Sequence, residues 1–115
     1  MIDNKMKIKD YGYDVSQVLD VSPFEYIDTF ACRSYLTDIF YSLDDEDKAI
    51  LKEYDKKLLL RAEEFYNYLK PIYRWGSSEK PYTHWWWHLD KVISGELNVD
   101  IEQWKVEING ETMSI

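Results

Sequence analysis

The spacing of apolar residues predicts a helix over 23–43. Apolar side chains recur every three or four positions from Phe24 to Leu43, as they do on a helix that packs against other elements. The stretch that precedes it has the order of a capping box, in which Ser22 accepts a hydrogen bond from a free backbone N–H, proline follows, and Glu25 reaches back. Because the apolar positions cover more than one narrow stripe, we expect contacts on two sides of this helix.

A second, longer helix is predicted over 45–70. Its apolar residues step by three and four from Leu51 to Leu69, with charged residues between them. The helix should end before Pro71, because the residue that precedes a proline avoids helical geometry. Four acidic residues lie at its start, where they suit the positive end of the helix dipole: Asp44, Asp45, Glu46 and Asp47.

The third predicted helix, 81–94, contains three consecutive tryptophans. At about 100° per residue, Trp85 and Trp86 share the buried stripe, whereas Trp87 points to the opposite side. We therefore expect Trp87 to be exposed, with burial under a C-terminal hairpin as the alternative. Gly95 marks the expected end of the helix.

The C-terminal residues predict a β-hairpin of strands 103–108 and 111–115. Polar and apolar residues alternate in both strands, and Asn109-Gly110 is the preferred pair for a two-residue turn of type I′. This turn sets a register that pairs Val106 with Met113 and Trp104 with Ile115. Since an isolated hairpin is only marginally stable, residues 5–9, in which apolar residues alternate with lysines, are predicted to add a third strand.

These elements predict an α+β fold, mainly helical, formed by residues 1–115 as a single domain. A chain of 115 residues buries enough surface to fold without metals or disulfides. No apolar run approaches the roughly 18 residues that a membrane span needs, so no membrane association is expected. The first residues lack the apolar segment of a secretory signal and Cys32 has no partner cysteine, which together favour a cytoplasmic location.

Charge is distributed unevenly along the chain. The net charge is −8, yet residues 10–47 carry ten acids against one base, Arg33, so this segment holds −9 and the remainder sums to +1. An acidic protein is not expected to bind nucleic acid directly, because phosphate binding depends on clustered lysines and arginines. The asymmetry can instead steer a basic partner toward the acidic half. The alternative is that the charge only maintains solubility.

Catalytic and cofactor motifs are absent from the sequence. Its four glycines are widely separated, so neither a phosphate-binding loop nor a dinucleotide fingerprint can be formed. No serine or cysteine lies in a recognisable nucleophile motif. His84 and His88 are one helical turn apart, a spacing at which two imidazoles can share a metal ion, but the third ligand is not identifiable. We therefore expect no cofactor and no enzyme activity, and keep as an alternative a small metal-binding protein or enzyme that uses His84 and His88.

Aromatic residues outside the predicted core suggest an interaction surface. Tryptophan and tyrosine anchor many protein interfaces because they bury a large area at little entropic cost. Lys91, one turn after Trp87, could instead stack on that ring within the molecule. The predicted partner-binding residues combine these aromatics with nearby polar residues and the acids before the second helix: Trp87, His84, His88, Lys91, Trp75, Tyr73, Asp44, Asp45, Glu46 and Asp47.

A small acidic domain without catalytic motifs favours a protein-binding function. We expect an inhibitor, an immunity-like or antitoxin-like protein, or an adaptor, which covers a basic surface of a protein partner. This expectation rests on a likeness of surface character to such proteins and not on a likeness of sequence. A structural or assembly subunit, forming a homo-oligomer or hetero-oligomer through the wide apolar faces of the first two helices, is the alternative.

Overall fold

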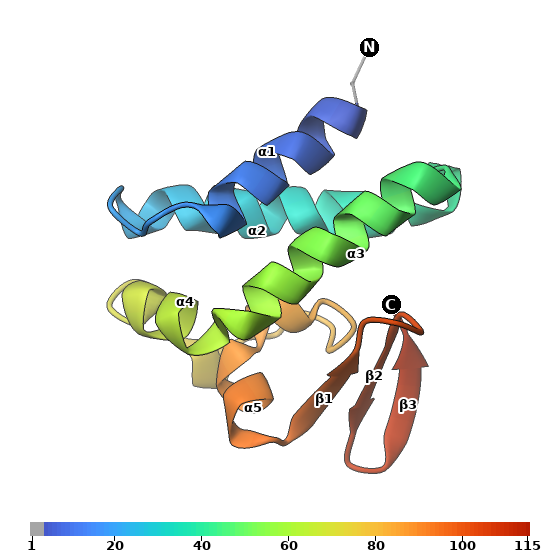
Figure 1. Ribbon diagram of the computed structural model, residues 1–115. Coiled ribbons are helices and arrows are strands. Elements are labelled where there is room, and N and C mark those ends of the chain that lie inside the picture. Colours follow the sequence, from blue (N-terminus) through green and yellow to red (C-terminus); the bar gives the residue numbers. More distant parts are fainter. Residues whose placement is uncertain (1–3) are drawn as a thin grey trace. The chain divides into compact units, whose positions relative to one another are not determined.

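The computed structural model describes residues 4–115 and has an α+β fold that is mainly helical (Figure 1). In the described chain, five α-helices and three short 3₁₀ segments come before a three-stranded antiparallel sheet at the C-terminus. The predicted fold class is thereby confirmed. The chain divides into two compact units, of which the first ends at Leu59 and the second begins at Leu60. The expectation of a single domain stays a prediction.

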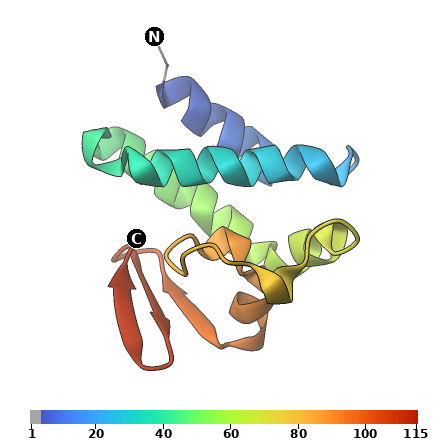
Figure 2. The ribbon, with the colours of Figure 1, turned by 180° about the vertical axis from the view of Figure 1, so that it is seen from behind.

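Three helices form the first unit: α1 (Asn4–Ser16), α2 (Pro23–Asp38) and α3 (Asp45–Leu60). In Figure 2, α2 lies in front, and α1 and α3 cross behind it. Each helix contributes apolar residues to a buried core: Ile8, Tyr11, Val15, Tyr26, Phe30, Leu36, Leu51 and Leu58. This interior is built from helix faces whose residues recur at spacings of three and four.

The predicted N-terminal strand, 5–9, is wrong, because these residues belong to helix α1. The alternation of lysines with apolar residues is too short to specify a strand. Ile8 also begins a series with Tyr11 and Val15, and this spacing of three and four places all three buried side chains on one helical face. The third strand of the sheet is β1 (Leu97–Asp100), which immediately precedes the hairpin.

Helix α2 begins where the sequence predicts. Pro23 is its first residue, and the Ser22 hydroxyl accepts a hydrogen bond from the Phe24 backbone N–H at 3.3 Å. The helix ends at Asp38 and not at 43, because Ile39 leaves helical geometry with φ −106° and ψ 13°. A short 3₁₀ segment, Phe40–Ser42, follows.

The single helix predicted over 45–70 is two helices, α3 and α4 (Ala62–Leu69). They are separated at Arg61, whose φ of −105° and ψ of 17° interrupt the helix. The residues around Arg61 include neither proline nor glycine, so no local feature of the sequence marks the break. The predicted start is confirmed, since Asp44 Oδ1 accepts a hydrogen bond from the Asp47 backbone N–H at 2.7 Å.

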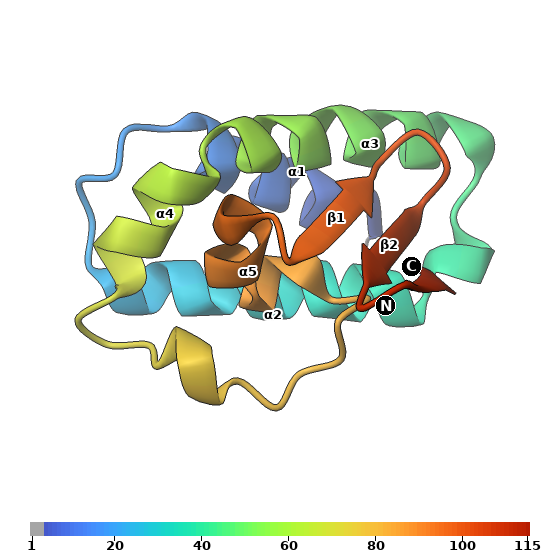
Figure 3. The ribbon, with the colours of Figure 1, turned by 90° about the horizontal axis from the view of Figure 1, so that it is seen from below.

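The second unit contains α4, α5 (Leu89–Ser94) and the sheet of β1, β2 (Lys105–Ile108) and β3 (Glu111–Ser114). Figure 3 shows α5 beside α4 and leading into β1. The predicted hairpin register is confirmed, because Val106 pairs with Met113 and the Trp104 carbonyl accepts a hydrogen bond from the Ile115 N–H at 2.8 Å. The predicted strands, 103–108 and 111–115, are too long: β2 begins only at Lys105, because Trp104 lies in a turn with a φ of 54°, and β3 ends at Ser114. Both turn residues have positive φ, 53° at Asn109 and 80° at Gly110, as a type I′ turn requires.

The helix predicted over 81–94 is wrong in its first half. Trp85–Trp87 forms a 3₁₀ turn, and α5 starts only after His88, whose φ is −134°. Successive side chains of a 3₁₀ turn are about 120° apart, so the 100° steps of an α-helix do not give the direction of Trp87. All three tryptophans are buried. The predicted end is confirmed at Gly95, which has a φ of 86°.

A buried ion pair joins the three helices of the first unit. The Arg33 guanidinium of α2 donates to both carboxylate oxygens of Asp55 in α3, with Nε–Oδ1 at 2.9 Å and Nη2–Oδ2 at 2.8 Å. The Tyr11 hydroxyl of α1 donates to Asp55 Oδ1 at 2.6 Å. Burial alone would lower the pKa of Arg33, but the Asp55 carboxylate outweighs it and raises that pKa. Burial, together with Asp55, raises the pKa of Tyr11 well above its ordinary value.

Replacing Gly12 with alanine is expected to lower the free energy of unfolding by about 1–3 kcal/mol. A Cβ at Gly12 in α1 would overlap the Tyr54 ring of α3. This overlap should outweigh the gain of about 1 kcal/mol that alanine has over glycine within a helix. Urea denaturation measures the difference. Gly76→Ala is the control, since no atom lies within 4 Å of that Cβ. A Gly12→Ala variant more stable than wild type would show that the Tyr54 ring moves aside.

None of the helices in residues 4–115 is long and apolar enough to cross a membrane.

Candidate partner-binding site

The aromatic residues predicted as anchors form a packed cluster. Trp75 and Trp87 are each only 4% exposed, so the predicted exposure of Trp87 is wrong. The Tyr73 ring lies 4.7 Å from that of Trp75 and 5.4 Å from that of Trp87. The cation over the Trp87 ring is Lys80, at 5.4 Å, and not Lys91. A ring that is already covered has little surface to offer a partner, so these tryptophans supply no argument for an anchor.

His84 and His88 make separate contacts. His84 stacks on Trp86 with ring centroids 5.0 Å apart. His88 is buried, and its Nε2 lies 2.7 Å from the Lys80 carbonyl oxygen. Since a carbonyl can only accept, Nε2 carries the proton and donates. Lys91 Nζ lies 3.5 Å from Asp90 Oδ2. Among residues 4–115, no group of three histidine, cysteine, aspartate or glutamate side chains is arranged to hold a metal ion.

Stability is expected to fall as the pH drops below about 6.5, because of His88. Burial lowers the pKa of His88, and nearby Lys91 adds to this effect. In that pH range the unfolded chain takes up a proton that the folded chain does not, so lower pH favours unfolding, by at most about 1.4 kcal/mol per pH unit. Urea denaturation between pH 7.5 and 5 measures this slope. His88→Gln should reduce the slope, and an unchanged slope would contradict the assignment.

The acids predicted as partner-binding at the start of α3 are partly occupied within the molecule. Asp47 is buried, and its Oδ1 lies 2.9 Å from the Lys5 ammonium, which is also 3.6 Å from Asp44. The hydrogen bond from the Asp47 backbone N–H lowers the pKa of Asp44. Asp45 and Glu46 are exposed. Helix capping and ion pairing within the molecule therefore occupy two of the four predicted acids, Asp44 and Asp47.

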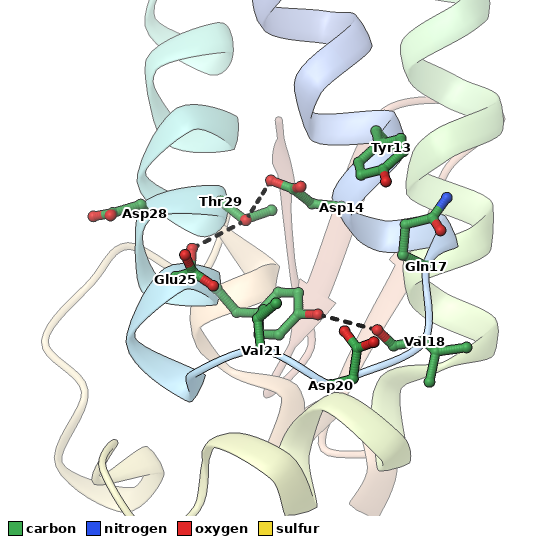
Figure 4. A pocket seen from close by; sticks show the side chains of 10 residues that line it. Tyr13, Asp14, Gln17, Val18, Asp20, Val21, Glu25, Asp28 and Thr29 are labelled. Carbon is green, nitrogen blue, oxygen red and sulfur yellow. Dashed lines mark hydrogen bonds between the residues drawn. The ribbon is translucent and has the colours of Figure 1, made fainter.

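A second acidic group, which the sequence did not single out, lies between α1 and α2. It lines a pocket of about 510 Å³, bounded by the end of α1, the loop 17–22 and the start of α2 (Figure 4). We call it the α1–α2 pocket. The residues that line the pocket are Tyr13, Asp14, Gln17, Val18, Asp20, Val21, Glu25, Tyr26, Asp28 and Thr29. Four of them carry a carboxylate, Asp14, Asp20, Glu25 and Asp28, and none is a lysine, arginine or histidine. None of the four carboxylates forms an ion pair with a described residue.

Hydrogen bonds hold the walls of the α1–α2 pocket in place. The Thr29 hydroxyl, on α2, donates to Asp14 Oδ2, on α1, at 2.8 Å. The Tyr26 hydroxyl donates to the Val18 carbonyl oxygen at 3.5 Å, which ties the loop to α2. Both bonds are drawn in Figure 4. Tyr26 and Thr29 are buried, so the pocket rests on fixed residues of the core.

Exposed apolar side chains surround the same pocket. Val18 is 75% exposed, Tyr13 is 65% exposed and Val21 is 43% exposed, and all three line the pocket. Single exposed apolar residues are ordinary on a protein surface, but several within one small region are typical of an interaction site. The α1–α2 pocket thus combines apolar surface with a negative charge that no described cation neutralises.

Comparisons with protein-family models, with curated proteins and with solved structures found no match to this chain.

Proposed function

We propose that the protein is a small acidic protein-binding module, an inhibitor, an immunity-like or antitoxin-like protein or an adaptor, which covers a basic surface of a protein partner. The observation that carries this proposal is the lining of the α1–α2 pocket: four carboxylates, no cationic residue, and exposed apolar side chains at its edge. A cytoplasmic location is part of the proposal, and the free thiol of Cys32 is compatible with a reducing compartment.

The two components of the pocket support different parts of the binding reaction. Exposed carboxylates act at long range and raise the association rate of a partner with complementary charge. Apolar side chains act only on contact, when water leaves their surface, and so slow dissociation. A basic protein surface that carries some apolar groups satisfies both components.

Self-association through this pocket is less favourable than binding of a basic partner. In a symmetric dimer the same surface meets its own copy. The carboxylates of the α1–α2 pocket, Asp14, Asp20, Glu25 and Asp28, would then face identical carboxylates, and like charges brought together oppose binding. The charge of the pocket thus favours a different, basic chain over a homo-oligomer. Nucleic acid and anionic membranes are disfavoured for the same reason.

Affinity capture from the lysate of the native host tests the proposal. We expect wild type to retain a basic protein at low salt and to release it as salt screens the charges. Asp20→Asn with Asp28→Asn should lose most of that protein, because both residues line the pocket and are exposed. Asp45→Asn with Glu46→Gln is the matched control, since it changes the net charge equally at exposed positions outside the pocket. Equal retention by both double variants would contradict the proposed site.

A further inference from the structure

We propose that the α1–α2 pocket binds a segment of its partner in which one aliphatic side chain lies between lysine or arginine residues. This inference rests on the proposed function and names the chemistry of the partner at the same site. It follows from how apolar and acidic groups alternate around the pocket.

The loop between the two helices supplies an apolar contact surface. Val18 and Val21 both line the pocket, and both expose much of their side chains. Tyr26 lies against the loop through its hydrogen bond to the Val18 carbonyl, so its ring supports the base of this surface. Burial of two exposed valines is favourable when the partner covers them with an apolar group of its own. A single leucine-sized or isoleucine-sized side chain fits within a pocket of about 510 Å³.

Carboxylates flank this apolar surface on two sides. Asp20 belongs to the loop, whereas Glu25 and Asp28 belong to the first two turns of α2. Figure 4 shows Val21 between Glu25 on one side and Asp20 on the other. A partner cation placed before the aliphatic residue and another placed after it can therefore each meet a carboxylate. This spacing favours a chain segment with separate charges over a single compact cation.

A small organic ligand fits the pocket less well. Small-molecule sites are enclosed and mostly apolar, with few polar groups that fix orientation. Here four carboxylates share the lining, and Val18 remains 75% exposed. A segment that belongs to a larger partner can cover the pocket together with the exposed side chains of Val18 and Tyr13 in its lining.

Two labelled synthetic peptides of equal charge test this inference on the full chain. One has a central leucine with two lysines on each side, and the other has serine in place of the leucine. By fluorescence anisotropy at low salt, we expect wild type to bind the leucine peptide about tenfold more tightly, as partial burial of a leucine predicts. In ¹H–¹⁵N spectra, the leucine peptide should shift amide resonances of residues 13–29.

Variants separate the apolar contribution from the charge. Val18→Ser should weaken binding of the leucine peptide about fivefold and leave the serine peptide unchanged. Ile93→Ser, at a residue that is also exposed but lies in α5, should change neither. Asp20→Asn with Asp28→Asn should weaken both peptides, and Asp45→Asn with Glu46→Gln should weaken them less. Circular dichroism establishes that each variant keeps its helical content.

The outcomes distinguish this inference from the proposed function. Equal binding of the two peptides, with the pocket charge variant weakening both, would overturn the aliphatic recognition and leave an acidic protein-binding pocket in place. Equal effects of the two charge variants, or no shifts within residues 13–29, would overturn the proposed site as well. Absence of binding of the leucine peptide at millimolar concentration would also overturn the inference.

Discussion

Replacing Asp55 with asparagine is expected to lower the free energy of unfolding by about 3–5 kcal/mol. The carboxylate accepts hydrogen bonds from Arg33 and Tyr11, and Arg33 and Asp55 are both completely buried. Asparagine keeps the shape of the side chain but removes the charge, so the guanidinium of Arg33 remains buried without a counter-charge. Urea denaturation followed by far-ultraviolet circular dichroism measures the loss.

Two further variants test whether charge is the cause. Asp45→Asn, at an exposed position in the first turn of α3, should cost less than about 1 kcal/mol. Replacing the pair together, with Arg33→Met and Asp55→Leu, should recover much of the stability, because apolar groups need no counter-charge. If Asp55→Asn costs as little as Asp45→Asn, the buried ion pair contributes far less to stability than its burial implies.

Replacing Trp87 with alanine is expected to destabilise the protein by about 3–5 kcal/mol. The side chain is 4% exposed and its ring lies against Tyr73 and Lys80, so its removal leaves a cavity. Urea denaturation followed by circular dichroism measures the effect, which an exposed anchor would not produce. Ile93→Ala, at a partly exposed position in α5, is the control and should cost much less. Unchanged stability of Trp87→Ala, with loss of partner binding, would restore the role of an exposed anchor.

Features that depend on neighbouring residues were predictable from the sequence. The type I′ turn at Asn109-Gly110 set the hairpin register, and Ser22 with Pro23 marked the start of α2. In both cases the groups that interact lie within a few residues of one another, so their chemistry is visible in the sequence itself.

Features that depend on distant contacts were not predictable. The break at Arg61 has no local marker. The 3₁₀ turn at Trp85–Trp87 is stabilised by burial of all three rings, which a helical wheel does not represent. The strand predicted over 5–9 is in fact part of the helix that carries Asp14, so the sequence does not predict the contact between Asp14 and Thr29 across the pocket. The only sequence signal for this site was the excess of acids in residues 10–47.

The central claim is that the α1–α2 pocket is the surface that meets a basic partner. The most direct test is the association rate constant of the captured partner, measured at 50 and 300 mM salt with three proteins: wild type, Asp20→Asn with Asp28→Asn, and Asp45→Asn with Glu46→Gln. At the lower salt we predict a decrease of about three- to tenfold for the pocket variant, a smaller decrease for the control, and convergence of all three at the higher salt. An association rate that does not depend on salt, or that both variants reduce equally, would contradict the claim.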